Sequence, residues 1–180
     1  MPAPDRALAE RIQRGDQDAF AELVQLHQRA VFNVAYRFFG NPHDAEDAAQ
    51  ETFLRAWRFF ARFDADKLIG PWLKRIAVNV CLNQLETRRP GLPLDEDGLQ
   101  PPDPNPGPES VAVRRDSESR IRAALSGLPP RYRAAIELRH FQELSYEEIA
   151  EALARPLSDV KSDLFRARKI LAERLKDMRP

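Results

Sequence analysis

Apolar residues in the first half of the chain recur every three or four positions, the spacing that places them on one face of an α-helix. Three such runs cover residues 20–38, 45–60 and 72–85. Gly40 is a typical stop for the first run, and Asn41, followed by a proline, is a typical start for the second. No stretch alternates apolar and polar residues between turn residues, so strands are not expected. The pattern predicts an N-terminal bundle of helices.

The second half carries three further runs of the same spacing, over residues 132–138, 149–153 and 160–175. Ser145 and Glu148 stand before the middle run at the spacing of a capping box. Cations on the last run lie mostly away from its apolar stripe; they are Lys161, Arg166, Lys169, Arg174 and Lys176. Two short helices, a tight turn and a basic outer face on the second helix are typical of a helix-turn-helix.

Between the two halves, the segment from Arg88 to Pro108 contains 7 of the 15 prolines. Proline lacks an amide donor and biases the preceding residue towards extended conformations, so this segment is not expected to be helical. We therefore predict an all-α fold of two small helical domains, residues 1–87 and 115–180. An acidic, Pro-rich linker over residues 88–114 is expected to join them.

The composition, with 180 residues, 43% hydrophobic and 31% charged, is that of a soluble globular protein. The single cysteine, Cys81, excludes an internal disulfide, and its apolar surroundings predict a core position. No segment of about 18 uncharged apolar residues exists, and the first residues lack the apolar stretch of a signal peptide. We expect a cytoplasmic protein without membrane insertion of its own.

Formal charge is unevenly distributed, although it sums to zero. It is −1 over residues 1–87, −3 over residues 88–119 and +4 over residues 120–180. Only the C-terminal end is therefore suited to meet phosphate groups. Because each neutralised phosphate needs a cation, this small surplus predicts weak binding of the isolated chain to DNA.

Residue types that carry enzyme chemistry are sparse and scattered. His27, His43 and His140 are far apart and show no zinc-ligand spacing. The chain has seven glycines and no Gly-rich phosphate loop. Ser145 is better explained as a helix cap than as a nucleophile. We expect no catalytic residue, no metal and no cofactor.

Several segments, in order along the chain, resemble conserved regions of the extracytoplasmic-function (ECF, group IV) sigma factors of bacterial RNA polymerase, in the sigma-70 family. Asp44–Trp57 resembles part of region 2, and Pro71–Asn79 resembles its promoter-reading helix. Leu128–Arg133 and Leu144–Ala150 resemble the start of region 4, and Val160–Arg168 resembles its recognition helix. The resemblance implies a stress- or signal-responsive factor that confers promoter recognition and DNA opening on the polymerase core.

The resemblance further implies that the helix over residues 44–57 docks on the β′ clamp helices of the polymerase. The residues it assigns to this contact are Asp44, Glu46, Asp47, Gln50, Glu51, Arg55 and Trp57. A solvated acidic face is the alternative for the charges, and burial in its own bundle is the alternative for Trp57. The C-terminal domain is expected to bind core as well, at the β flap. The linker would run towards the RNA exit path or act as an idle tether.

The downstream promoter element is expected to meet the loop that begins at Phe63 and the helix after it. Strand opening needs stacking for an extruded base and polar groups for its edge and phosphates. The residues that the resemblance assigns are Phe63, Lys67, Arg75, Asn79 and Asn83. Simple core positions are the alternative for Phe63 and Trp72.

The upstream promoter element is expected to meet the last helix and the turn before it. The assigned residues are Ser158, Asp159, Lys161, Ser162, Arg166 and Arg168. The chain departs from the family pattern at Ala154, Arg155, Asp159 and Asp163, where glycine, an apolar residue, threonine and arginine are usual. Carboxylates on a DNA-facing helix repel phosphate, although aspartate can accept a hydrogen bond from cytosine. We therefore predict weak or unusually selective upstream contacts.

The resemblance also implies control by an anti-sigma factor. Two other functions remain open at this stage. A helix-turn-helix regulator that acts without polymerase would bind duplex DNA tightly, with a steep salt dependence. A degenerate homologue would bind only protein partners. Run-off transcription with purified core polymerase separates the three.

Overall fold

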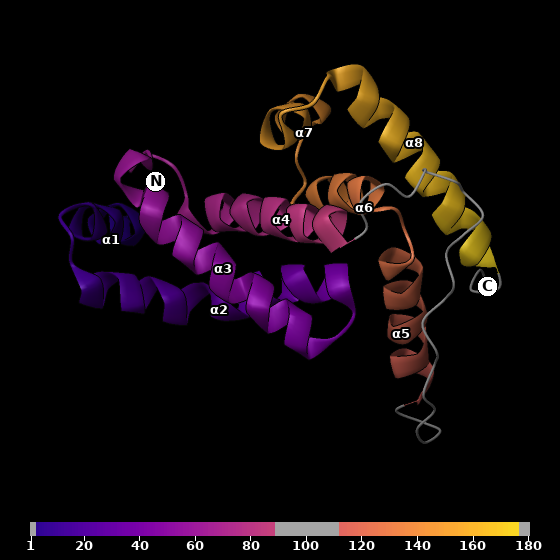
Figure 1. Cartoon of the computed structure of the whole chain (residues 1–180), viewed down its shortest axis with the longest axis horizontal. Coiled ribbons are helices and arrows are strands. Elements are labelled where there is room, and N and C mark those ends of the chain that lie inside the picture. Colours follow the sequence, from indigo (N-terminus) through magenta and orange to yellow (C-terminus); the bar gives the residue numbers. More distant parts are fainter. Residues whose placement is uncertain (1–2, 89–111, 177–180) are drawn as a thin grey trace. The chain divides into compact units, whose positions relative to one another are not determined.

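The structure, a computed structural model, describes residues 3–88 and 112–176 (Figure 1). Within these ranges the chain is helical apart from short turns and contains no strand, which confirms the predicted all-α class. The chain forms two compact units, residues 1–81 and residues 82–180, which we call the N-terminal and C-terminal units. Most of the segment that was predicted to be a linker lies outside the described residues.

The N-terminal unit is a helical bundle in which the second and third helices, α2 (Gln17–Phe39) and α3 (Pro42–Phe59), pack side by side (Figure 1). Its other elements are α1 (Ala3–Gln13), η1 (Phe60–Arg62) and α4 (Ile69–Arg88), which extends past the unit. Gly40 ends α2 in the left-handed conformation, with φ at 73°. The side chain of Asn41 caps α3 by accepting from the amide of Asp44 at 2.9 Å. Both predicted boundary signals are confirmed.

Apolar side chains fill the core of this unit. Its largest fully buried residues include Leu23 and Phe38 from α2 and Leu73 from α4, and Cys81 is buried as predicted. Aromatic contacts join the start of α4 to η1 and the residue after it. The ring of Trp72 on α4 lies 5.3 Å from that of Phe60 and 4.8 Å from that of Phe63, measured between centroids. The side chain of Gln13 fastens α1 to the same place by donating to the carbonyl oxygen of Phe63 at 2.7 Å.

The C-terminal unit contains the predicted helix-turn-helix. Its elements are α5 (Ala112–Ser126), α6 (Pro130–Ile136), η2 (Glu137–Phe141, a π-helix), α7 (Tyr146–Leu153) and α8 (Leu157–Arg174). The capping box of Ser145 and Glu148 is present at the start of α7 and confirms that prediction. Ala154 then turns the chain in the left-handed conformation, with φ at 51°. The apolar stripe of α8 packs inward through Val160, Leu164 and Ala167.

Two helices are present that the apolar pattern did not predict. In the first, α1, the buried apolar residues are Leu8, Ala9 and Ile12 among the positions whose burial is described. The second, α5, has charged residues through most of its length and buries Ala124 and Leu125 at its end. A run with so few inward-facing apolar residues gives a weak helical period, although packing in the folded chain still stabilises the helix.

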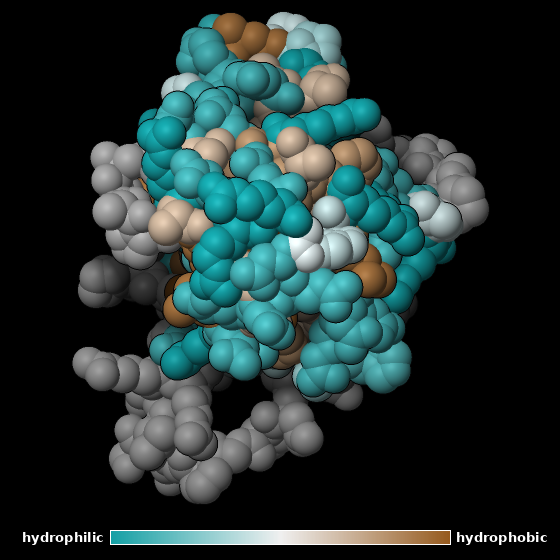
Figure 2. All heavy atoms as spheres, turned by 90° about the vertical axis from the view of Figure 1, so that its left-hand side faces the viewer, coloured by the Kyte–Doolittle hydropathy of each residue, from teal (hydrophilic) through white to brown (hydrophobic). Residues whose placement is uncertain are grey.

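The face of the molecule drawn in Figure 2 is mostly polar: hydrophilic side chains prevail on it, and apolar side chains form small separate spots. Of the helices that the structure describes, none is both long enough and apolar enough to span a bilayer.

Candidate functional site

An apolar groove runs between α2 and α3 in the N-terminal unit. It consists of two adjoining hollows of about 500 and 440 Å³, which share Val24, Gln50 and Phe53. Trp57 lines one end, 40% exposed, with its ring 4.9 Å from that of Phe20 in an edge-on contact. The indole is therefore only partly buried in its own unit: one side packs on Phe20, and the other faces the groove and leaves area accessible to a partner.

The seven residues predicted to bind polymerase divide into two surfaces. Those that line the groove are Glu46, Gln50 and Trp57. The others recur every three or four positions on a different face of α3 and do not line either hollow; they are Asp44, Asp47, Glu51 and Arg55. Within this second set, Glu51 and Arg55 pair with each other at 2.7 Å. The groove is thus the surface with unpartnered apolar area, and the acidic face lies beside it.

One group of potential metal ligands lies at the start of α3. His43, Asp44 and Asp47 bring one ligand atom each within 4.8 Å of one another. These atoms belong to exposed or half-buried side chains, and Asp44 already accepts a hydrogen bond from the side-chain amide of Asn41 at 2.8 Å. Acidic residues at a helix N-terminus are favoured by the helix dipole without any ion. The group therefore has a sufficient explanation without a metal.

The predicted downstream DNA residues differ in how much of each side chain is accessible. Lys67 and Asn83 are exposed, while Arg75 is half-buried. Asn79 is also half-buried, and its amide donates to the carbonyl oxygen of Arg75 at 3.2 Å. Phe63 is only 6% exposed, so in this structure it occupies a core position, the second of the two roles considered for it from the sequence. In this conformation the accessible polar groups are therefore those of the loop and of the outer side of α4.

His27 lies beside the start of α4. Its ring is so close to Gly70 that a Cβ at residue 70 would stand 3.4 Å from the His27 Cε1 atom. Burial lowers the pKa of His27, and the nearby charge of Lys74 lowers it further against an opposing effect of Asp5. The fold of the N-terminal unit therefore favours the neutral imidazole.

The outward face of α8 carries the side chains suited to a DNA groove. Lys161, Ser162 and Arg166 are exposed. Phe165, which was not among the predicted site residues, is 70% exposed on the same helix. The signal for it was present in the sequence, because Phe165 follows Lys161 by four positions and stands outside the apolar stripe. Apolar contact with a thymine methyl is one use of such a side chain in a major groove.

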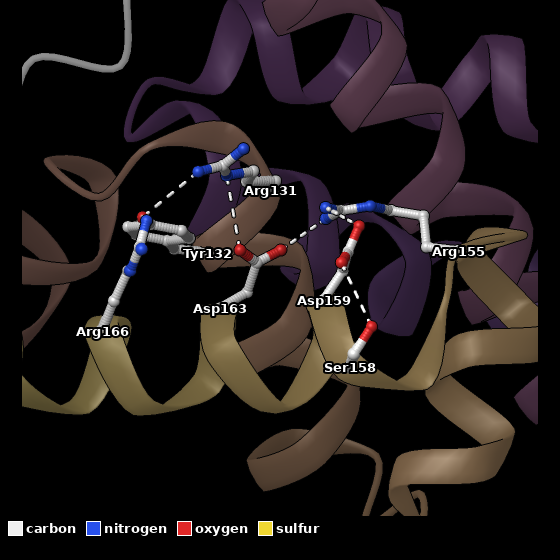
Figure 3. A network of polar contacts seen from close by, with 7 residues as sticks. All are labelled: Arg131, Tyr132, Arg155, Ser158, Asp159, Asp163 and Arg166. Carbon is white, nitrogen blue, oxygen red and sulfur yellow. Dashed lines mark hydrogen bonds and ion pairs between the residues drawn. The ribbon is translucent and has the colours of Figure 1, made fainter.

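Asp163 does not lie on this outward face, so the prediction that it repels phosphate there is wrong. It is 4% exposed and points back into the unit (Figure 3). One carboxylate oxygen lies 3.4 Å from Nε of Arg131 on α6, and the other pairs closely with Arg155. Two guanidinium groups therefore neutralise it, and it presents no net negative field to a DNA backbone.

Arg155 and Asp159 explain two more departures from the family pattern. Arg155 follows the left-handed Ala154 and is held between Asp163 and Asp159, whose carboxylate is 3.4 Å from Nη2 (Figure 3). The hydroxyl of Ser158 lies 3.4 Å from the same carboxylate of Asp159. An ion pair thus occupies a position in the turn where the family has an apolar residue.

A second basic cluster surrounds Tyr146 at the start of α7. Arg168 donates to the hydroxyl of Tyr146 at 3.2 Å, and Arg139 lies 5.3 Å from the centre of the same ring. Burial lowers the pKa of His140, and the charges of Arg168 and Arg139 lower it further. Arg168, one of the residues assigned to the upstream promoter element, is therefore preorganised by an aromatic hydroxyl.

Comparison with protein families matches both halves of the chain. Residues 23–90 match the family Sigma-70 region 2, and residues 118–171 match Sigma-70, region 4. The first match covers all the predicted downstream residues and the groove apart from Gln17 and Phe20. The second covers the helix-turn-helix and the polar network around Asp163.

Curated relatives match over nearly the whole chain. The ECF RNA polymerase sigma factor SigW of Bacillus subtilis is 34% identical over 177 residues, which is 93% of this chain and 95% of that protein. The ECF RNA polymerase sigma-E factor of Escherichia coli is 34% identical over 184 residues, covering 97% of this chain and 95% of that protein. The alignments therefore span both units of this chain.

Two solved structures share the fold across both units. CnrH, solved in complex with the cytosolic domain of CnrY, has 28% sequence identity and a TM-score of 0.65, covering 96% of this chain and 97% of that chain. The sigma factor RpoE of Bartonella quintana, solved in complex with the anti-sigma factor NepR, has 25% identity and a TM-score of 0.60, covering 89% and 98%.

Proposed function

The chain belongs to the ECF sigma factors of the sigma-70 family, and from this we propose how its two units divide the work of promoter-specific initiation. A sigma factor acts in transcription initiation as a subunit of RNA polymerase and is not an enzyme in its own right. In our proposal the N-terminal unit provides the main contact with core polymerase, and this unit together with the rest of α4 reads the downstream element. The C-terminal unit reads the upstream element.

The observation that carries the proposal is the apolar groove between α2 and α3. Phe20, Phe53 and Trp57 contribute aromatic area there, and Leu54 beside them is 54% exposed. Exposed aromatic residues in a hollow are the usual anchors of protein interfaces. The groove is of a size to receive side chains of the β′ clamp helices, while Glu46 and the acidic face beside it would orient the contact electrostatically.

In the downstream contact, the exposed Lys67 and Asn83 are proposed to meet phosphate and base edges. Phe63 has a different role in this account, since it supports the loop from below by packing on Phe60 and Trp72. Arg75 and Asn79 are held together on α4 and are proposed to act as a pair.

For the upstream contact, α8 is proposed to enter the major groove with Lys161, Ser162 and Phe165 facing the bases. Arg166 and Arg168 lie further along the helix, where they would contact the phosphate backbone. Because Asp163 is neutralised, this contact is expected to be selective without being weakened by repulsion.

Regulation by an anti-sigma factor is the second part of the proposal. RpoE of Bartonella quintana was solved with the anti-sigma factor NepR, and CnrH with the cytosolic domain of CnrY. An inhibitor that covers the groove between α2 and α3 would block the proposed polymerase contact directly.

The test is run-off transcription with purified bacterial core polymerase lacking its own specificity subunit, on a pool of promoter fragments. We expect specific start sites only when the chain is added, and we expect Trp57→Ala to reduce their yield strongly when the chain is limiting. Leu26→Ala on α2 is the control, because Leu26 is 64% exposed but does not line the groove. Core binding without initiation would favour a protein-interaction module, and tight binding of the chain alone to duplex DNA would favour a polymerase-independent regulator.

A further inference from the structure

Three segments of the C-terminal unit converge on one buried carboxylate. Asp163 on α8 receives Arg131 from α6 and Arg155 from the turn between α7 and α8 (Figure 3). The side chain of Asp163 is 5% exposed, whereas those of Arg131 and Arg155 are 25% and 24% exposed. The carboxylate is thus the inner member of the cluster, and each guanidinium reaches it from a different element.

The contacts continue on both sides of this carboxylate. Towards the start of α8, Arg155 also binds Asp159. On the other side, Arg131 of α6 donates to the hydroxyl of its neighbour Tyr132 at 3.3 Å. Arg166, further along α8, donates to the same hydroxyl at 3.4 Å. The network therefore follows the first half of α8, the part that a helix-turn-helix presents to the bases.

Geometry distinguishes this arrangement from ordinary apolar packing. An apolar contact tolerates small rotations of a helix, because the hydrophobic effect is not directional. The buried carboxylate of Asp163 does not, because its hydrogen bond from Arg155 weakens steeply with angle and its charge is costly to separate from Arg131 and Arg155. Buried polar groups can in this way select one packing arrangement among several that apolar residues would permit.

We propose that Asp163 is a positioning residue that, through Arg131 and Arg155, fixes the rotation of α8 and so determines which upstream base pairs its outward side chains contact. Ser162 and Lys161 precede Asp163 directly, and Phe165 follows two residues later, so a rotation of the helix moves all of them together. The inference rests on the proposed reading of the upstream element by α8. It gives a role to Arg155 and Asp163, two positions where the chain departs from its family.

The test uses holoenzyme reconstituted from the full chain and core polymerase. Wild-type holoenzyme first selects promoter fragments from a pool of random sequence. The downstream part of the best fragment is then kept constant, while the upstream element is varied one base pair at a time. Binding of each fragment gives a ranking of base preferences, and core affinity and thermal unfolding are measured on the same preparations.

The decisive variant is Asp163→Asn, which keeps the size of the side chain and removes its charge. We expect the preference for the best base at one or more positions to fall by roughly 5- to 10-fold or to move to another base, with core affinity unchanged. Glu173→Gln is the matched control. It removes a carboxylate from the same helix, but Glu173 is 61% exposed and pairs only with Lys176 in the described part of the chain.

A second variant keeps the proposal falsifiable if Asp163→Asn folds poorly. Arg155→Gln removes one partner at a position where the guanidinium can reach solvent, and it should shift the same base preferences to a smaller extent. The double variant should change the ranking no more than Asp163→Asn alone, because both residues act through one contact.

The outcomes separate this inference from the function on which it rests. If wild-type holoenzyme shows no base preference upstream, the proposed upstream contact is wrong and the inference falls with it. If the wild type has a clear preference and both single variants retain the same ranking, with only a lower folded fraction, the network is merely structural and the inference alone is overturned.

Discussion

The two units of this sigma factor differ in what is buried beneath their functional surfaces. In the described part of the N-terminal unit, the one buried polar side chain is that of Thr52, whose hydroxyl donates to the carbonyl oxygen of Ala48 at 2.7 Å. The C-terminal unit buries Arg133, Glu137 and Asp163. The apolar core of the N-terminal unit supports a groove that gains affinity from exposed aromatic area. The C-terminal unit instead holds the buried carboxylate of Asp163 between two guanidinium groups, beneath a helix whose orientation matters.

This difference has a physical basis. Hydrophobic packing stabilises strongly but is not directional, which suits a docking surface that gains its affinity from exposed aromatic area. Buried ion pairs add little net stability, because desolvation offsets most of the attraction, but they penalise every arrangement that separates the partners. The orientation of α8 in the C-terminal unit should therefore be sensitive to the loss of a single charge, that of Asp163.

The largest expected effect is on the stability of the C-terminal unit. Asp163→Asn should lower its free energy of unfolding by about 3 kcal/mol, the lower end for breaking a buried ion pair, because Arg131 and Arg155 can turn to solvent. Hydrogen exchange of the full chain, resolved by segment, measures the loss in α6 and α8 separately from the N-terminal unit. Glu173→Gln should change stability by less than about 0.5 kcal/mol. Equal effects of the two variants would contradict the account.

The next effect concerns the groove. Trp57→Ala should weaken binding to core polymerase by about 2 kcal/mol or more, roughly 30-fold, because a half-exposed aromatic anchor is lost. Titration of core with labelled chain measures the affinity. The exposed Leu26→Ala should leave the affinity within about twofold, since it lies outside the groove. An unchanged affinity for Trp57→Ala would remove the groove from the docking surface.

The left-handed caps provide a smaller and opposite pair of effects. Gly40 ends α2 at a φ of 73°, so Gly40→Ala should destabilise the N-terminal unit by about 1 kcal/mol. Ala154 adopts a φ of 51° at the end of α7, so Ala154→Gly should relieve strain and stabilise the C-terminal unit by up to about 1 kcal/mol. Segment-resolved hydrogen exchange checks both signs. A destabilised Ala154→Gly variant would mean that unfolded-chain entropy outweighs the strain.

The smallest expected effect is a pH dependence of the N-terminal unit. Because burial lowers the pKa of His27, the unfolded chain binds a proton at a higher pH than the folded chain does. Stability should be full above the unfolded pKa of about 6.5 and decline as the pH falls below it. Thermal unfolding between pH 7.5 and 5.5 measures this decline. The His27→Gln variant should show a flatter profile, and an unchanged slope would exclude His27 as its source.

Helix positions and boundaries were largely predictable from the sequence. Gly40, Asn41 and the pair of Ser145 and Glu148 act through their own neighbours in the chain, so local rules suffice for them. The charged α5 was missed because its stability comes from packing at one end, which the sequence does not display.

The candidate site was only partly predictable, because a side chain on a helix can face either way. Asp163 was predicted to face DNA because it stands between Lys161 and Arg166 in the recognition helix. Its side chain lies instead on the inner side of α8, whereas those of Lys161 and Arg166 are exposed. Its partners are 32 positions earlier, at Arg131, and 8 positions earlier, at Arg155. A pairing of this kind depends on the tertiary fold. The groove depends on it too, since its walls come from two helices.

The most direct test of this division between units measures core affinity and upstream base preference on the same preparations of two variants. The account predicts a crossed result: Trp57→Ala loses core affinity but, at concentrations that restore the complex, keeps the wild-type ranking of upstream bases. Asp163→Asn keeps core affinity and changes the ranking. If either variant alters both properties to a similar degree, the two units do not act independently and the account is wrong.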